Sequence, residues 1–140
     1  MSATKEKTLQ NKTILLIEDD HFILRIYSKW LTASGATVIT ANDGAQGLRL
    51  LDERRVDLVL LDLGMPGLNG YDTLAEIRKK EYGKDLPVII LSNTTMNENR
   101  EGFADLRDSG VKDILRKYEV SLSEIVEKIA SYFPKVTTDV

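Results

Sequence analysis

Short apolar runs alternate with longer amphipathic segments along the 140 residues of this chain. The runs are rich in β-branched and other large apolar residues, and they have the length of strands rather than helices. We therefore expect strands at residues 13–17, 37–41, 57–61, 87–91 and 112–115. Three of the runs are continuously apolar, which is typical of parallel strands covered by helices on both faces.

The segments between these runs carry the apolar spacing of amphipathic helices. The pattern predicts helices between Asp20 and Gly35 and at residues 44–54, 71–80 and 98–108, with a fifth from Ser121 to just before Pro134. Asp20 and Asp43 precede two of them and are expected to act as N-caps. Ser121 and Glu124 have the spacing of a capping box.

Five strands that alternate with five helices predict one α/β domain. Because parallel crossovers are right-handed, we expect a doubly wound, flavodoxin-like sheet of order 2-1-3-4-5. The domain is expected to cover residues 12–134. Residues 1–11 are interpreted as a polar N-terminal tail, and residues 135–140 as a C-terminal tail.

Composition narrows the possible partners and metals. The chain is 42% hydrophobic and 29% charged, has a net charge of −3, and lacks an apolar run of membrane-spanning length. Neither direct nucleic-acid binding nor membrane binding is therefore expected. The first eleven residues lack the apolar core of a secretory signal, so we expect a cytoplasmic protein. With no cysteine, any metal must be held by oxygen or histidine.

Acidic residues follow the first and third predicted strands. Glu18, Asp19 and Asp20 come directly after the first, and Asp62 comes after the third. In a doubly wound sheet the ligand crevice lies beyond the carboxyl ends of these two strands. Carboxylate oxygens are suitable ligands for Mg²⁺, so we expect Glu18, Asp19 and Asp62 to form a magnesium site.

The remaining strand ends supply hydrogen-bond donors and a cation. Ser92 follows the fourth strand and Lys117 follows the fifth, so both should lie at the edge that carries the acids. Residues 63–70, directly after Asp62, are rich in turn-forming residues that allow backbone groups to approach a ligand.

These residues together resemble the receiver domain of bacterial two-component response regulators, in particular stand-alone receivers similar to chemotaxis regulators. The resemblance covers nearly the whole chain. The family's acidic pair corresponds to Glu18 and Asp19, and its phospho-accepting aspartate corresponds to Asp62. Its Met-Pro-x-x-x-Gly loop corresponds to Met65, Pro66 and Gly70. Its hydroxyl position corresponds to Ser92 and its lysine position to Lys117.

The resemblance implies a phosphoprotein that takes a phosphoryl group onto Asp62 from a sensor histidine kinase or phosphotransfer protein, and then changes its binding to a downstream protein. Mg²⁺ would be held by Asp19, Asp62 and the Gly64 carbonyl, with Glu18 acting through water. Ser92 and Lys117 would contact the phosphoryl group. Such a protein is not a turnover enzyme, although it can dephosphorylate itself.

The sequence departs from the family pattern at three positions. Tyr118 follows the lysine where the family usually has proline, Ile114 replaces the aromatic residue of strand five, and Asn93 stands where a small residue is usual. These departures support an alternative, which is a receiver-like interaction module that signals without phosphorylation.

Two other classes of protein share parts of the pattern. A flavodoxin-like electron carrier needs a phosphate cradle after strand one, where Glu18, Asp19 and Asp20 would repel the phosphate. A phosphatase with an Asp-x-Asp nucleophile needs a second aspartate at the position of Gly64.

Overall fold

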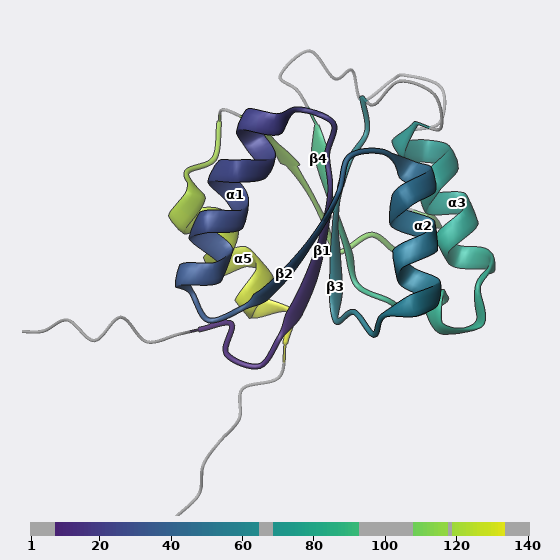
Figure 1. Cartoon of the computed structure of the whole chain (residues 1–140), viewed down its shortest axis with the longest axis horizontal. Coiled ribbons are helices and arrows are strands. Elements are labelled where there is room, and N and C mark those ends of the chain that lie inside the picture. Colours follow the sequence, from purple (N-terminus) through teal and green to yellow (C-terminus); the bar gives the residue numbers. More distant parts are fainter. Residues whose placement is uncertain (1–7, 65–68, 93–107, 118, 134–140) are drawn as a thin grey trace, which may run out of the picture.

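The fold is built on a five-stranded parallel sheet (Figure 1). The computed structural model describes residues 8–64, 69–92, 108–117 and 119–133. Its strands are β1 (Thr13–Ile17), β2 (Thr37–Ala41), β3 (Leu58–Asp62), β4 (Val88–Ser92) and β5 (Asp113–Arg116). They are arranged in the order β2-β1-β3-β4-β5, which confirms the predicted topology.

Helices cover both faces of the sheet. The described helices are α1 (His21–Ala33), α2 (Gly44–Glu53), α3 (Gly70–Lys79), the 3₁₀ helix η1 (Glu81–Gly83) and α5 (Leu122–Ser131). α1 and α5 pack on one face, and α2 and α3 pack on the other (Figure 1). No helix in the described ranges is long and apolar enough to cross a membrane. Nearly all of the helix predicted at residues 98–108 lies outside the described residues.

Local capping explains where the helices begin. The Asp20 carboxylate accepts hydrogen bonds from the N–H groups of Phe22 and Ile23, which confirms the predicted cap of α1. The predicted cap of α2 and the capping box of α5 are also present. Helix α3 begins one residue earlier than predicted, because the Asn69 side chain accepts a hydrogen bond from Asp72 N–H and acts as its cap.

The three C-terminal strands each begin and end one residue later than the sequence predicted. Asp57, expected as the first residue of β3, instead accepts a hydrogen bond from Thr13 N–H through its side chain at 2.7 Å. Pro87, expected as the first residue of β4, has no N–H to donate to a neighbouring strand. At the other end, Asp62 and Ser92 are the last residues of β3 and β4, and pairing with the neighbouring strands holds their backbones in place.

The core consists of two layers separated by the sheet. Ile14 and Leu16 of β1 face α1 and α5, while Leu15 and Ile17 face α2 and α3. All four side chains have no exposed surface, and the same holds for residues 58–61 and 88–91. This burial on both faces accounts for the continuously apolar runs in the sequence.

The segment before β1 departs from the prediction of a polar tail. Leu9 is completely buried in the layer under α1 and α5, and its N–H donates to the Ser34 carbonyl at 2.9 Å. Next to it, the Lys12 ammonium lies 4.7 Å from the centre of the Phe133 ring. One apolar residue among polar neighbours has no periodicity, so its burial was not evident from the sequence pattern.

Replacement of Leu9 should therefore destabilise the whole domain. We expect Leu9→Ala to lower the free energy of unfolding by about 2–4 kcal/mol, because it leaves a cavity in the core. Gln10→Ala changes an exposed neighbour and should have almost no effect. Urea denaturation of both variants measures the difference, and equal midpoints would show that Leu9 does not pack in solution as described.

Candidate functional site

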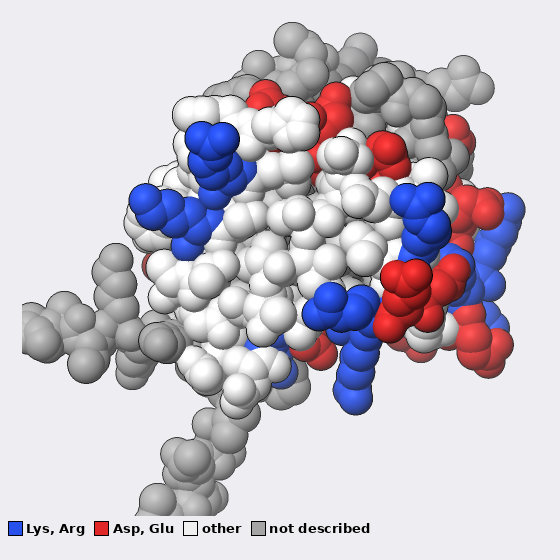
Figure 2. Space-filling view, in the orientation of Figure 1, with Lys and Arg blue, Asp and Glu red and all other residues white. Residues whose placement is uncertain are grey.

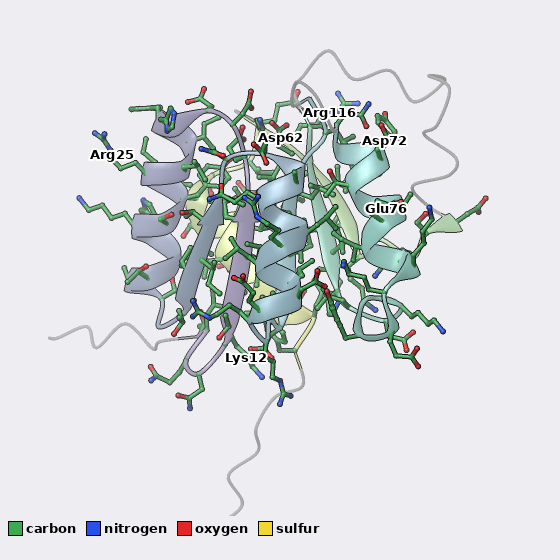
Figure 3. All side chains as sticks on the ribbon, turned by 45° about the vertical axis from the view of Figure 1, so that its right-hand side comes forward. Lys12, Arg25, Asp62, Asp72, Glu76 and Arg116 are labelled. Atoms are coloured by element: carbon green, nitrogen blue, oxygen red, sulfur yellow. The ribbon has the colours of Figure 1, made fainter. Side chains whose placement is uncertain are left out.

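Residues from four strand ends meet at one edge of the sheet. Glu18 follows β1, Asp62 and Ser92 end β3 and β4, and Lys117 follows β5. The strands are in register there, with Asp62 beside Leu91 and Ser92 beside Arg116. Figure 3 shows Asp62 and Arg116 near the same end of the molecule. The sequence predicted the site at this same edge, beyond the carboxyl ends of the strands.

Three carboxylates converge at this edge. Glu18, Asp19 and Asp62 each offer an oxygen, and these oxygens all lie within 4.8 Å of one another. Glu18 has no exposed surface and Asp62 is 4% exposed, whereas Asp19 is more accessible. A set of oxygen donors at this spacing fits a hard divalent cation such as Mg²⁺. The cluster predicted from the sequence is formed.

An open cavity gives access to these carboxylates. It has a volume of about 470 Å³ and is lined by Glu18, Asp19, Asp20, Ile23, Asp62, Gly64 and Lys117. Acidic side chains gather toward this upper end of the molecule in Figure 2. Ile23 forms an apolar part of the wall, which the sequence analysis did not foresee. The sequence did contain a signal for this role of Ile23. The residue lies three positions after the N-cap of α1, and such a residue lies above the first helical turn.

Lys117 lies between two of the acids. Its Nζ atom is 2.6 Å from Glu18 Oε1 and 3.0 Å from Asp62 Oδ1. The backbone N–H of Lys117 donates to the Ser92 carbonyl at 2.7 Å, which ties the residue to β4. Asp62 Oδ1 also accepts a hydrogen bond from Gly64 N–H at 3.1 Å. The lysine therefore faces the acids as predicted, and one ammonium is shared by two buried carboxyl groups.

Burial and charge separate the pKa values of the two buried acids. Burial raises the pKa of Glu18 to about 8; Lys117 opposes this rise and the Asp62 carboxylate adds to it. Burial also acts to raise the pKa of Asp62, but hydrogen bonds from Glu18, Gly64 N–H and Lys117 outweigh it and hold the pKa below its usual value. Without a metal, the proton of the pair resides on Glu18 at neutral pH and Asp62 is ionised.

Ser92 is the last residue of β4, and Gly64 lies two residues after Asp62. Ser92 is 2% exposed, and its hydroxyl lies 3.5 Å from the Leu115 carbonyl, which is long for a hydrogen bond from a hydroxyl. The hydroxyl can therefore turn toward a better acceptor. Gly64 lines the cavity, while the role of its carbonyl as a metal ligand stays a prediction.

Of the other positions in the family pattern, the structure describes Gly70 and Ile114. A Cβ atom on Gly70 would lie 2.5 Å from the Asp62 carbonyl oxygen, so only glycine allows α3 to begin so close to Asp62. Ile114 is partly buried against the α2 and α3 layer. Predictions at Met65, Pro66, Asn93 and Tyr118 lie outside the described residues.

Residues 14–130 match the model of the response regulator receiver domain family. The chain belongs to this family. Among its relatives is the Regulator of RpoS of Escherichia coli K12, 33% identical over 129 residues that cover 91% of this receiver and 37% of the relative. The nitrate/nitrite response regulator NarL of the same organism is 37% identical over 124 residues, covering 81% of this receiver and 56% of NarL. This receiver thus spans less than two thirds of either relative.

Solved structures agree with the family. A response regulator receiver domain protein from Clostridium thermocellum superposes with a TM-score of 0.75 at 31% identity, covering 86% of this receiver and 92% of that chain. The Vibrio cholerae chemotaxis protein CheY4 superposes with a TM-score of 0.78 at 22% identity, covering 87% and 98% respectively. At that identity, the CheY4 comparison supports the fold alone.

The raised pKa of Glu18 should make the stability of the metal-free receiver depend on pH. The folded state retains a proton that the unfolded state has lost, so this contribution is fully present below about pH 4.5 and is lost as the pH rises through about 8. Relative to Glu18→Gln, the parent should lose at least about 1 kcal/mol between pH 5 and pH 8, because one pKa unit corresponds to about 1.4 kcal/mol. Denaturation in EDTA measures this. Exposed Glu53→Gln is the control, and a pH-independent difference for Glu18→Gln would contradict the assignment.

Above about pH 8, where Glu18 is ionised as well, three carboxylates face one ammonium, and this excess of negative charge should strain the metal-free site. At about pH 9, Asp62→Asn and Asp19→Asn each remove one of these charges, so each should stabilise the receiver in EDTA by about 1–2 kcal/mol after screening. The parent should gain from Mg²⁺ by about 1.4 kcal/mol at 10 mM, if the dissociation constant is of order 1 mM, and the variants should gain less. Thermal melts with EDTA and with Mg²⁺ test both effects. If neither variant melts higher in EDTA and Mg²⁺ leaves the parent unchanged, the three carboxylates do not form one metal pocket.

Proposed function

We propose that this receiver accepts a phosphoryl group on Asp62 in a Mg²⁺-dependent transfer from a phosphohistidine of a sensor kinase or phosphotransfer protein. One observation carries the proposal. Asp62 is an almost fully buried carboxylate with a low pKa, with Lys117 at 3.0 Å and two further carboxylates close enough to share a cation. An ion pair that only stabilises a fold needs one acid for one lysine. Here three acids cluster beside one lysine, and such a concentration of charge is typical of functional sites.

The three clustered carboxylates support a division of roles around the metal. Asp19 and Asp62 would bind Mg²⁺ directly with the Gly64 carbonyl, and Glu18 would act through water. When bound, the ion supplies positive charge that offsets the acids and the oxygens of the incoming phosphoryl group. Asp19 is the most accessible of the three acids, so it offers a route of entry for the ion.

Asp62 is the nucleophile in this proposal. One of its carboxylate oxygens forms a bond to phosphorus while the bond from phosphorus to the donor nitrogen breaks, and the electron pair of that bond stays on the nitrogen. The Lys117 ammonium already lies 3.0 Å from Asp62 Oδ1, so little reorganisation is needed to stabilise the charge of the transferred group. Positioning and charge provide most of the catalysis in phosphoryl transfer.

Phosphorylation of Asp62 would change the hydrogen bonding of Ser92, and this change can explain how the receiver switches between two states. Among the described residues, the Ser92 hydroxyl has a long contact to the Leu115 carbonyl, and a phosphoryl oxygen on Asp62 would be a stronger acceptor. Ser92 would then change partner and bias the backbone after β4, altering the surface offered to a downstream protein. Water hydrolyses the acyl phosphate, so the receiver acts as a resettable phospho-acceptor rather than a turnover enzyme.

A receiver-like interaction module that signals without phosphorylation is the second candidate. Its support is Ile114 in β5, where the family usually has an aromatic residue that takes part in switching. The buried acids and Lys117 favour the phosphorylated form, because an interaction module has no need of them.

Acceptor identity is tested with acetyl phosphate and Mg²⁺. The parent should gain the mass of one phosphoryl group, and Asp62→Asn should gain none, because the amide is a poor nucleophile. Asp20→Asn is the matched control. It changes another acid of the same cavity, and asparagine caps a helix as well as aspartate does. Intact-mass measurement reads out labelling, and equal labelling of Asp62→Asn and the parent would remove Asp62 from the mechanism.

A further inference from the structure

A cage of backbone carbonyls holds the Arg78 side chain in the last turn of α3. Nε donates to the Ser109 carbonyl at 2.6 Å, and one terminal nitrogen donates to the carbonyls of Gly83 and Leu86 at 2.8 and 2.7 Å. The other terminal nitrogen reaches the Gly110 carbonyl at 3.3 Å. Gly83 and Leu86 belong to the connection from α3 to β4, whereas Ser109 and Gly110 form the turn before β5.

This arrangement depends on arginine. Its guanidinium has five N–H donors in a planar fork, which can reach acceptors on two separate connections at once. Lysine has three donors on one atom and cannot reproduce the fork. The four acceptors are uncharged carbonyls, and the nearby acid that acts on the charge of Arg78 is Asp85. Arg78 therefore serves to join segments of backbone.

The other end of α3 rests on the acceptor residue. Gly70 N–H donates to the Leu63 carbonyl at 3.3 Å, and a Cβ atom on Gly70 would lie 2.5 Å from the Asp62 carbonyl oxygen. In Figure 3, α3 runs from the level of Asp62, where Asp72 is labelled, down past Glu76. A helix of ten residues is a stiff rod about 15 Å long, so a shift of its first turn reaches its last turn.

Strand β5 is thus connected to Asp62 at both of its ends. Beyond its last residue, Lys117 contacts the Asp62 carboxylate at 3.0 Å. Before its first residue, Ser109 and Gly110 are held by Arg78, whose helix begins against the Asp62 backbone. The position in β5 where the family usually has an aromatic residue is Ile114, an aliphatic side chain partly buried against the α2 and α3 layer.

We propose that Arg78 is a positioning residue that transmits the phosphorylation state of Asp62 through α3 to the turn before β5. The inference rests on the proposed function, because it concerns what happens after Asp62 is occupied. The proposed route from Asp62 to β5 runs through α3 and Arg78, and it involves neither Ser92 nor an aromatic residue in β5.

Hydrogen–deuterium exchange with and without beryllofluoride and Mg²⁺ tests this route. In the parent, beryllofluoride should change exchange in residues 108–117. Arg78→Lys should still accept a phosphoryl group from acetyl phosphate at Asp62, but should lose most of that exchange response. Lys79→Ala is the matched control and should behave like the parent, since it removes the neighbouring exposed cation, which forms an ion pair with Glu76 at 2.8 Å on the same helix. Arg78→Lys should also melt roughly 5 °C lower, because several hydrogen bonds to a charged group are lost.

Each outcome bears on the proposal. A parent-sized response in Arg78→Lys, with Asp62 still labelled, would overturn the role of Arg78 and leave the proposed function intact. Absence of labelling in the parent itself would instead refute the proposed function, and the inference with it. A parent that is labelled but shows no response in residues 108–117 would also overturn the inference.

A measurement on the unaltered chain covers the case in which Arg78→Lys does not fold. The Arg78 Nε–H group donates a short hydrogen bond to Ser109 and should give a resolved, slowly exchanging NMR signal. We expect this signal to shift when beryllofluoride occupies the site. A signal that stays in place, while signals around Asp62 move, would show that α3 does not carry the change to this end.

Discussion

The contact of one buried ammonium with two buried carboxylates is the interaction on which the site depends. Removing charges from water costs several kcal/mol per ion, and Lys117 offsets only part of this for Glu18 and Asp62. The remaining negative charge favours a proton on Glu18, as its pKa of about 8 indicates, or a cation near the cluster. The site therefore favours ligands that reduce its negative charge.

Such a site requires a rigid support, and the central strands provide it. The side chains of residues 14–17, 58–61 and 88–91 are completely buried, with α1 and α5 on one face and α2 and α3 on the other. Dense packing resists small displacements, so the acids stay together although their charges repel. Backbone hydrogen bonds such as that from Lys117 N–H to the Ser92 carbonyl extend this order past the strand ends.

Helix α3 links Asp62, at the carboxyl ends of the strands, to the opposite end of the sheet, where β4 and β5 begin. Its first residue is a glycine because the Asp62 backbone leaves no room for a Cβ atom. Its last turn carries Arg78, which joins the connections that lead into β4 and β5. A charge change at Asp62 thus has two mechanical connections to β5, one through Lys117 and one through α3.

The sequence by itself determined the number and order of the strands, the caps of α1, α2 and α5, and the convergence of the acids, because these follow from local spacing and from the rule that parallel strands end at one side of the sheet. Asp20 and Ser121 cap helices through neighbours two or three residues away. Only the tertiary structure decided that Leu9 belongs to the core, that burial raises the pKa of Glu18, and that Arg78 joins two distant connections. These features depend on residues far apart in the chain, and no spacing along the sequence records such contacts.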